Sequence, residues 1–157
     1  MSELSPRLPY REFAKAAVSI HASLIAVSKA VSESGLDKGL LELVKLRASQ
    51  INGCAFCLQL HLGLARQAGV SPVKIDLLAA WRESGVFSAR EAAALAWTET
   101  LTGLGPTAAS DVDYAAVLSQ FNESEAMFLT VAIGLINQWN RIAIGLRFAP
   151  ILAEPSA

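Results

Sequence analysis

Apolar residues recur three or four positions apart along most of this chain, which is the period of an amphipathic α-helix. The first stripe predicts one long helix that ends near Gly35, and it consists of Phe13, Ala17, Ile20, Leu24, Val27 and Val31. The second stripe consists of Leu40, Leu41, Val44, Ala48 and Ile51. It predicts a helix that Asp37 caps and that ends at Asn52-Gly53.

Residues that typically start and stop helices divide the rest of the chain. A third helix is predicted from about Cys54 to Ala68. The later ones are predicted to begin at Ser71-Pro72, at the capping box Ser88 to Glu91, at Asp111 or Asp113, and at the capping box Asn122 to Glu125. The last helix runs through Trp139 toward Arg147. We therefore expect about seven helices and no strand, packed as a single compact all-α domain over residues 1–157.

Composition supports this fold class. Ala (27) and Leu (22) far outnumber Val and Ile together (19), so helix-favouring residues dominate over those that favour sheets. Thirteen basic and 14 acidic residues give a net charge of -1 without a block of like charge, which argues against nucleic-acid binding. Because 53% of the residues are apolar and only 17% are charged, we expect some apolar faces to be covered by other subunits.

The longest strongly apolar stretch is too short to span a membrane, which predicts a soluble protein. It runs from Ala126 to Ile136, eleven residues, whereas a membrane-spanning helix needs about 20. Residues 1–12 contain charged residues and prolines and no continuous apolar segment, so they do not resemble a secretory signal. We therefore expect a cytoplasmic protein that does not associate with membranes.

Both cysteines and one of the two histidines fall within eight residues, at Cys54, Cys57 and His61. At about 100° per residue, Cys57 and His61 lie at about 300° and 340° from Cys54 on a helix, so all three share one narrow stripe. The start of a helix favours a thiolate, which is the reactive form of cysteine. We also expect Cys54 to be the more exposed sulfur. His61 is placed to accept a thiol proton.

Glu42 lies on the preceding predicted helix, at a similar distance from the Gly53 break as His61. If the two helices fold back antiparallel, Glu42 lies about 16 Å and His61 about 12 Å from the break, so the carboxylate can orient the imidazole. Pairing of Glu42 with Lys45 or Lys38 is the alternative. Gln50 is expected either near this site or at the surface.

The chain resembles the alkylhydroperoxidase D (AhpD)-like branch of the carboxymuconolactone decarboxylase superfamily, with a family core at about residues 37–104. The resemblance rests on Glu42 twelve residues before Cys54, on Leu46-Arg47-Ala48-Ser49-Gln50-Ile51-Asn52-Gly53-Cys54-Ala55-Phe56-Cys57, on His61, on Ala80-Trp81-Arg82-Glu83 and Ala93-Ala94-Leu95-Ala96-Trp97, and on Ile136-Asn137-Gln138-Trp139-Asn140-Arg141. One departure is Phe56, where the prototype has a further His. The decarboxylase branch generally lacks the cysteine pair.

This resemblance implies a thiol-dependent peroxidase or disulfide oxidoreductase. Its cysteine pair would cycle between dithiol and disulfide, with Glu42 and His61 as a proton relay to Cys57. The implied substrate is a hydroperoxide or a disulfide, and the implied reductant is a dithiol protein or a small thiol. No tightly bound cofactor and no metal are expected. Relatives of this size form homotrimers or homohexamers, and we expect the first helix and the Trp139-Asn140-Arg141 segment to provide subunit contacts.

Other interpretations of these residues remain open. The cysteines can be an inert buried pair or a redox sensor in a non-catalytic helical oligomer. A structural zinc site would use Cys54, Cys57, His61 and the distant His21. His21 is otherwise expected to be a hydrogen-bonded boundary residue. Trp81, Trp97 and Trp139 are typical of core or interface positions, and Arg141 is expected to satisfy a carboxylate or a helix end across a subunit contact.

Overall fold

The computed structural model describes residues 5–151, and within them every regular element is a helix and there is no strand. The helices are α1 (Tyr10–Ala16), α2 (Val18–Ser32), α3 (Lys38–Asn52), α4 (Ala55–Gln67), α5 (Pro72–Leu77), the 3-10 turn η1 (Leu78–Ala80), α6 (Trp81–Ser84), α7 (Ala89–Thr102), α8 (Asp111–Leu118) and α9 (Glu123–Leu146). The predicted all-α class is confirmed.

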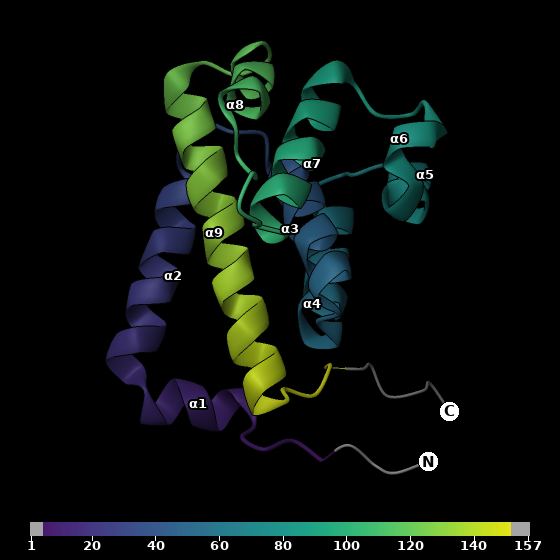
Figure 1. Ribbon diagram of the computed structural model, residues 1–157. Coiled ribbons are helices and arrows are strands. Elements are labelled where there is room, and N and C mark those ends of the chain that lie inside the picture. Colours follow the sequence, from purple (N-terminus) through teal and green to yellow (C-terminus); the bar gives the residue numbers. More distant parts are fainter. Residues whose placement is uncertain (1–4, 152–157) are drawn as a thin grey trace.

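Helix α3 is the centre of the packing, in contact with α4, α7 and α9. Helix α9 runs the length of the molecule, with α2 along one side of it (Figure 1). Asp37 caps α3 as predicted, because its Oδ1 accepts a hydrogen bond from the Leu40 N–H at 2.8 Å. Four of the five predicted stripe residues on α3 are buried, and Ile51 is exposed.

The predicted single helix through residues 13–31 is wrong. The helix is interrupted at Ala17, where the backbone leaves the helical region. The direction of the chain changes by 107° between α1 and α2. Phe13 packs against Phe148 at the carboxyl end of α9, and Arg7 and Leu8 donate backbone hydrogen bonds to Leu146 O, so α1 lies across that end of α9. Tertiary contacts therefore override the local helical period.

One further boundary differs from the sequence predictions. The predicted fourth helix is divided into α5, η1 and α6. Helix α8 begins at Asp111, one of its two predicted starts, and its cap is Ser110, whose hydroxyl accepts from the Asp113 N–H while Asp113 bonds back. The capping boxes at Ser88 and Asn122 are confirmed. A serine cap one position earlier places both aspartates in the first turn, where the helix dipole favours them.

None of the single helices within residues 5–151 is long and apolar enough to cross a membrane. Helices α1 and α2 together reach the required length and composition, but they are the two segments separated by the 107° bend.

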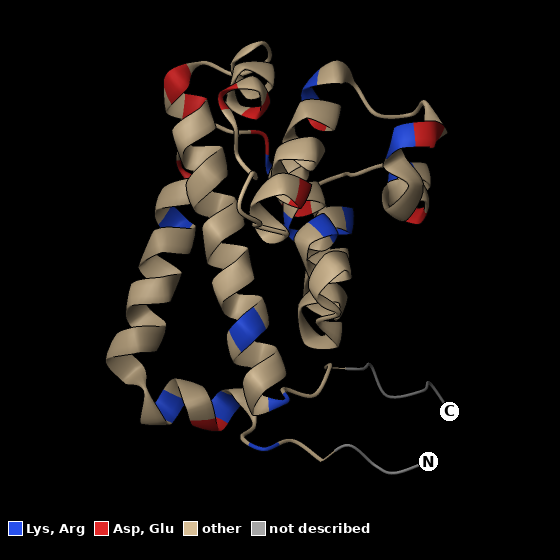
Figure 2. Cartoon of the chain, in the orientation of Figure 1, with Lys and Arg blue, Asp and Glu red and all other residues tan. Residues whose placement is uncertain are grey.

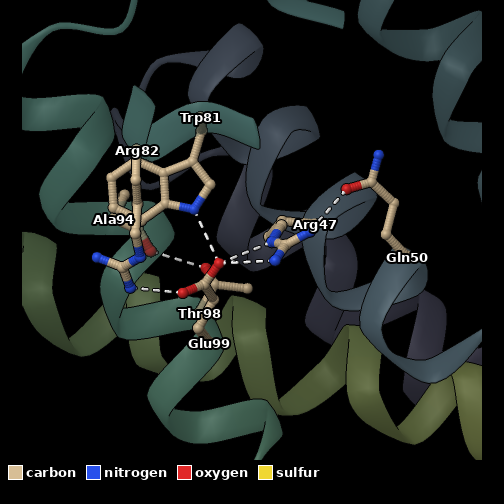
Figure 3. A network of polar contacts seen from close by, with 7 residues as sticks. All are labelled: Arg47, Gln50, Trp81, Arg82, Ala94, Thr98 and Glu99. Carbon is tan, nitrogen blue, oxygen red and sulfur yellow. Dashed lines mark hydrogen bonds and ion pairs between the residues drawn. The ribbon is translucent and has the colours of Figure 1, made fainter. Parts of the chain in front are cut away.

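Glu99 ties three helices together (Figure 3). Its carboxylate, on α7, accepts hydrogen bonds from Arg47 Nε on α3 at 2.9 Å, from Trp81 Nε1 on α6 at 2.8 Å, and from Arg82. The Arg82 guanidinium also stacks over the Trp81 ring at 4.2 Å. Burial raises the pKa of Glu99, but the hydrogen bonds from Trp81, Arg82 and Arg47 outweigh it, and the net pKa lies below the usual value.

Replacing Glu99 with Gln is expected to lower the free energy of unfolding at pH 7 by about 1–3 kcal/mol, because several donors lose a charged acceptor. A carboxyl group whose pKa falls on folding stabilises the protein above its unfolded pKa, and this contribution is lost as pH falls through the folded pKa. The difference between wild type and Glu99→Gln should therefore shrink below about pH 4 in denaturant titrations. Glu12→Gln, which removes an exposed pair with Lys15, is the control and should change stability by less than about 1 kcal/mol. An equal loss at pH 3 and pH 7 would contradict the role of the charge.

Candidate active site

The two cysteines lie at the turn between α3 and α4 and are joined by a disulfide. Gly53 adopts the left-handed conformation (φ 70°) that ends α3, and Cys54 becomes the N-cap residue of α4. The sulfur of Cys54 accepts a hydrogen bond from the Cys57 N–H at 3.3 Å. The predicted start of the third helix is thus correct within one residue, and both sulfurs lie on its first turn.

Both cysteines are buried. Cys54 is 1% exposed and Cys57 is 3% exposed, so the expectation that Cys54 is the more accessible sulfur is wrong. Residues of α1, α9 and the segment after α9 cover the turn, since Cys54 and Cys57 pack in one cluster with Phe13, Ile136 and Phe148. Sequence spacing places Cys54 at the end of its helix, but that end faces the protein core.

His61 and Glu42 meet as predicted. His61 Nδ1, on α4, is 2.7 Å from Glu42 Oε2, on α3, and both side chains are largely buried. The contact requires α3 and α4 to fold back on each other across Gly53. The alternative pairing is present as well, because Lys45 Nζ donates to Glu42 Oε1 at 2.6 Å. One carboxylate therefore holds an imidazole with one oxygen and an ammonium with the other.

The charge state of Glu42 follows from these partners. Burial raises the pKa of its carboxyl group, whereas the hydrogen bond and charge of His61 and the charge and hydrogen bond of Lys45 lower it. The effect of His61 and Lys45 is larger than that of burial, so the net pKa of Glu42 lies below the usual value. Glu42 is therefore ionised at neutral pH. An ionised carboxylate at Nδ1 holds the proton on that nitrogen and leaves Nε2 free to accept another.

A cavity of about 320 Å³ adjoins this site. Cys57 and His61 line it, together with side chains from α1, α2, α3 and α9. The other lining side chains that carry polar groups are Tyr10, Ser28, Lys45 and Trp139, and the rest are aliphatic or aromatic. Cys54 is not among the lining residues that the structure describes. A small molecule in this cavity would thus contact Cys57, whereas Cys54 is not on the cavity wall.

His21 lies beside Tyr10 and is separate from the Glu42–His61 pair. Its Nε2 is 2.8 Å from Tyr10 Oη, and its ring packs edge-on against Trp139, so it is the hydrogen-bonded boundary residue expected from the sequence. Within residues 5–151, no three His, Cys, Asp or Glu side chains are grouped as a metal site. The ligands of the zinc alternative are therefore not brought together.

Phe56 belongs to an aromatic group at one end of the cavity. Its ring lies 5.4 Å from those of Tyr10 and Phe148, and it is 6% exposed. Phe56 therefore adds an apolar wall at the position where the prototype of the AhpD-like branch carries a further histidine.

The structure also places the glutamine, the tryptophans and the arginine for which the sequence raised expectations. Gln50 accepts a hydrogen bond from Arg47 at 3.2 Å (Figure 3). Trp81 and Trp97 are buried, as expected. Arg141 donates hydrogen bonds to the backbone oxygen and the side-chain oxygen of Asn137 on its own helix. The expected contact of Arg141 across a subunit interface stays a prediction.

Sequence reasoning missed Tyr10 as a member of the site. Tyr10 reaches the cavity from α1, more than 40 residues before Cys57, and no motif near it signals this role. Lys45 was expected on the Glu42 carboxylate as an alternative to His61, from its position three residues after Glu42 on a helix, and the structure has both contacts.

Comparisons with known proteins show the family of the chain. The model of the carboxymuconolactone decarboxylase family matches residues 10–100. The chain is 34% identical over 143 residues to YdfG, an uncharacterized protein of Bacillus subtilis (strain 168), covering 91% of this chain and 95% of that one.

Two solved structures share the fold. One is a protein of unknown function from Agrobacterium tumefaciens, for which a role as antioxidant defence protein AhpD has been suggested. It is 38% identical, with a TM-score of 0.88, and the match covers 95% of this chain and 100% of that one. The other is an uncharacterized peroxidase-related protein from Silicibacter sp. TM1040, 24% identical with a TM-score of 0.76, covering 85% and 71% of the two chains. The second likeness shows the fold alone.

Proposed function

Because the chain belongs to the carboxymuconolactone decarboxylase family, we propose that it is a thiol-dependent oxidoreductase of the AhpD-like kind that reduces hydroperoxides. The family also includes decarboxylases, so membership alone does not select this activity. The observation that carries the proposal is the Cys54–Cys57 pair beside the Glu42–His61 contact, with Cys57 and His61 on the wall of one apolar cavity.

The first step of the proposed reaction uses the reduced pair. His61, oriented by ionised Glu42, accepts the proton of the Cys57 thiol. The Cys57 thiolate attacks the terminal peroxide oxygen, the O–O bond breaks, and Cys57 becomes a sulfenic acid. The departing alkoxide takes up the proton that His61 holds, and an alcohol is released. The sulfur is oxidised by two electrons and the peroxide is reduced by two.

The second step restores the disulfide. The Cys54 thiol attacks the sulfenic sulfur of Cys57, a disulfide forms, and water leaves. An external dithiol then reduces the disulfide by exchange and becomes oxidised itself. A small dithiol would reach the pair through the cavity that Cys57 lines, whereas a dithiol protein would need local opening of the fold, as a protein disulfide would. Such reductants belong to reducing compartments, and on this ground we place the protein in the cytoplasm. No tightly bound cofactor takes part in the proposed cycle.

The surroundings of Cys57 favour a small organic hydroperoxide over a protein disulfide as the oxidising substrate. Both sulfurs are nearly inaccessible from the surface, so a protein disulfide cannot reach them without local opening of the fold. The cavity is mostly apolar and of a size that suits a small organic molecule. Burial of an apolar substituent there would contribute binding energy that hydrogen peroxide lacks.

A reductant-coupled peroxidase assay tests this function. Cumene hydroperoxide and hydrogen peroxide should both be reduced, with the higher kcat/KM for the organic substrate. Ser28 lines the cavity from α2, so Ser28→Phe should fill part of it. We expect this variant to lower kcat/KM for cumene hydroperoxide about tenfold, with little change for hydrogen peroxide.

Ser28→Ala is the matched control for the cavity, and it should behave as the wild type. Equal losses for both peroxides in Ser28→Phe would contradict binding in the cavity. Absence of turnover with any hydroperoxide, together with slow and ordinary thiol reactivity of both cysteines, would favour the non-catalytic alternative in which the cysteines are structural or redox-sensing.

We also propose that the chain forms a homotrimer or homohexamer. Helix α2 exposes Val18, Ile20, Ile25 and Val27 by 64, 55, 47 and 39%. Few charged residues lie along α2 and the adjoining part of α9 (Figure 2). An apolar face of this kind suits a second copy of the chain. Leu24 and Val31, from the same predicted stripe, are instead buried within the subunit.

Light scattering at micromolar concentration should give a mass of three or six times 16.7 kDa. Ile20→Glu should shift the mass toward one subunit while leaving helicity unchanged, because a buried unpaired charge destabilises an interface. Gln67→Glu introduces the same charge at an exposed position at the end of α4 and should have no effect. A wild-type mass near 16.7 kDa would contradict the oligomer.

A further inference from the structure

A buried network of amide and hydroxyl side chains joins α3 to α9. Asn52 Nδ2, at the end of α3, donates to Asn137 Oδ1 and to Asn140 Oδ1 on α9, both at 2.8 Å. Asn140 Nδ2 donates to Ser49 Oγ on α3 at 3.0 Å. Asn137 Nδ2 donates to Thr102 Oγ1 on α7 at 3.0 Å. These contacts link residues that lie 35 to 91 positions apart in the chain.

The network is closed to water over most of its extent. Asn140 and Ser49 are completely buried, and Asn137 and Thr102 are 7 and 9% exposed. Every buried side-chain nitrogen and oxygen within the described part of the chain has a partner. A fully satisfied buried network adds little net stability compared with apolar packing, but it permits only one arrangement of its members. Its main physical effect is therefore to hold the elements it joins in one position.

The element held is the turn that carries the cysteines. The Cys54 N–H donates to Ser49 O at 3.0 Å, so Ser49 bonds to the cysteine with its backbone and to Asn140 with its side chain. Asn52 immediately precedes Gly53, whose left-handed conformation forms the turn. The network thus attaches the residues on the amino side of Cys54 to α9, while Cys57 lies on the helix that follows.

We propose that Asn52, Asn140 and Ser49 are positioning residues that lower the reduction potential of the Cys54–Cys57 pair by holding the turn in the geometry of the disulfide. This inference rests on the proposed redox cycling of the pair. None of the three side chains needs to touch the substrate. They act on the equilibrium between dithiol and disulfide, which decides how strong a reductant must be to reset the protein.

The direction of the effect follows from conformational entropy. In exchange with oxidised glutathione, the two thiols form one disulfide, two S–H bonds are lost, and two molecules of reduced glutathione are released. A turn that is already held in place loses little freedom when its sulfurs join, so the disulfide is favoured. A loosened turn gains freedom in the dithiol form, and its disulfide becomes easier to reduce.

The test is an equilibrium titration of the full chain in glutathione redox buffers, with the dithiol fraction measured by thiol alkylation and mass spectrometry. Asn52→Ala and Ser49→Ala are each expected to shift the equilibrium constant about tenfold toward the dithiol, which corresponds to about 30 mV. Ser49→Ala removes a single oxygen and keeps the backbone bond to Cys54, so it serves if Asn52→Ala does not fold.

Leu129→Ala is the control for destabilisation, because it opens a cavity at a completely buried position of α9 outside the network. It should lower the free energy of unfolding without moving the potential. An unchanged equilibrium constant in a folded Asn52→Ala or Ser49→Ala variant, or an equal shift in Leu129→Ala, overturns the inference and leaves the proposed function intact. A wild-type pair that does not exchange with glutathione overturns both.

Discussion

Replacement of either Cys54 or Cys57 by serine should abolish reductant-coupled peroxide turnover. One sulfur cannot complete a cycle that ends in an intramolecular disulfide, since the sulfenic acid then has no thiol beside it. Helicity measured by circular dichroism should stay unchanged in both variants, because serine is close in size to cysteine at these positions. Full turnover in either single variant would contradict the two-cysteine mechanism.

The two serine variants also distinguish the attacking sulfur. Cys57 and not Cys54 lines the cavity within the described residues, so Cys54→Ser should still form one equivalent of sulfenic acid when peroxide is added. Trapping with dimedone and mass spectrometry measures this single turnover. Cys57→Ser should form none. The opposite pattern would show that Cys54 attacks first, and it would leave the need for both cysteines unchanged.

Loss of the histidine should produce the second large effect. His61→Ala is expected to slow peroxide reduction near neutral pH by about a hundredfold to ten-thousandfold, the range for a lost general base. The loss should become smaller at high pH, where hydroxide ionises the thiol without help. Glu42→Gln should slow peroxide reduction less than His61→Ala does, because the amide oxygen of glutamine can still accept a hydrogen bond from His61 Nδ1.

Glu42 keeps the same charge over the neutral pH range in which these variants are compared. Because its pKa lies below the usual value, Glu42 stays ionised throughout the neutral range, and the carboxylate itself contributes no pH dependence there. Its contribution to stability is present above the unfolded pKa and is lost as pH falls through the lower folded pKa. The measurement is a pH profile of kcat/KM for wild type, His61→Ala and Glu42→Gln, with Glu12→Gln as the control. A decrease in kcat/KM that is the same at every pH would indicate a structural effect of the substitutions instead of a lost general base.

Local sequence patterns were sufficient for much of the fold. Capping residues such as Asp37, Ser88 and Asn122 mark helix starts because their side chains bond to backbone groups only two or three residues away. The same short range explains why Cys54, Cys57 and His61 could be placed on one helix from spacing alone. The contact between Glu42 and His61 was also predictable, since a single tight turn at Gly53 connects their two helices.

Features that depend on distant segments were not predictable. The break at Ala17 arises because Phe13 packs on the end of α9, whereas the helical period of residues 13–31 continues through the break. The burial of Cys54 has the same origin. Spacing places this residue at a helix end, but spacing carries no information on what covers that end.

By itself, therefore, the sequence determined the all-α class, the helix caps, and the alignment of two thiols, an imidazole and a carboxylate, since these follow from backbone geometry over a few turns. The tertiary structure alone decided which cysteine lines the cavity, that Tyr10 and Ser28 line it as well, and that Asn52 and Asn140 attach the cysteine turn to α9. Those features depend on contacts between segments up to about 90 residues apart, and their geometry is set by the packing of whole helices.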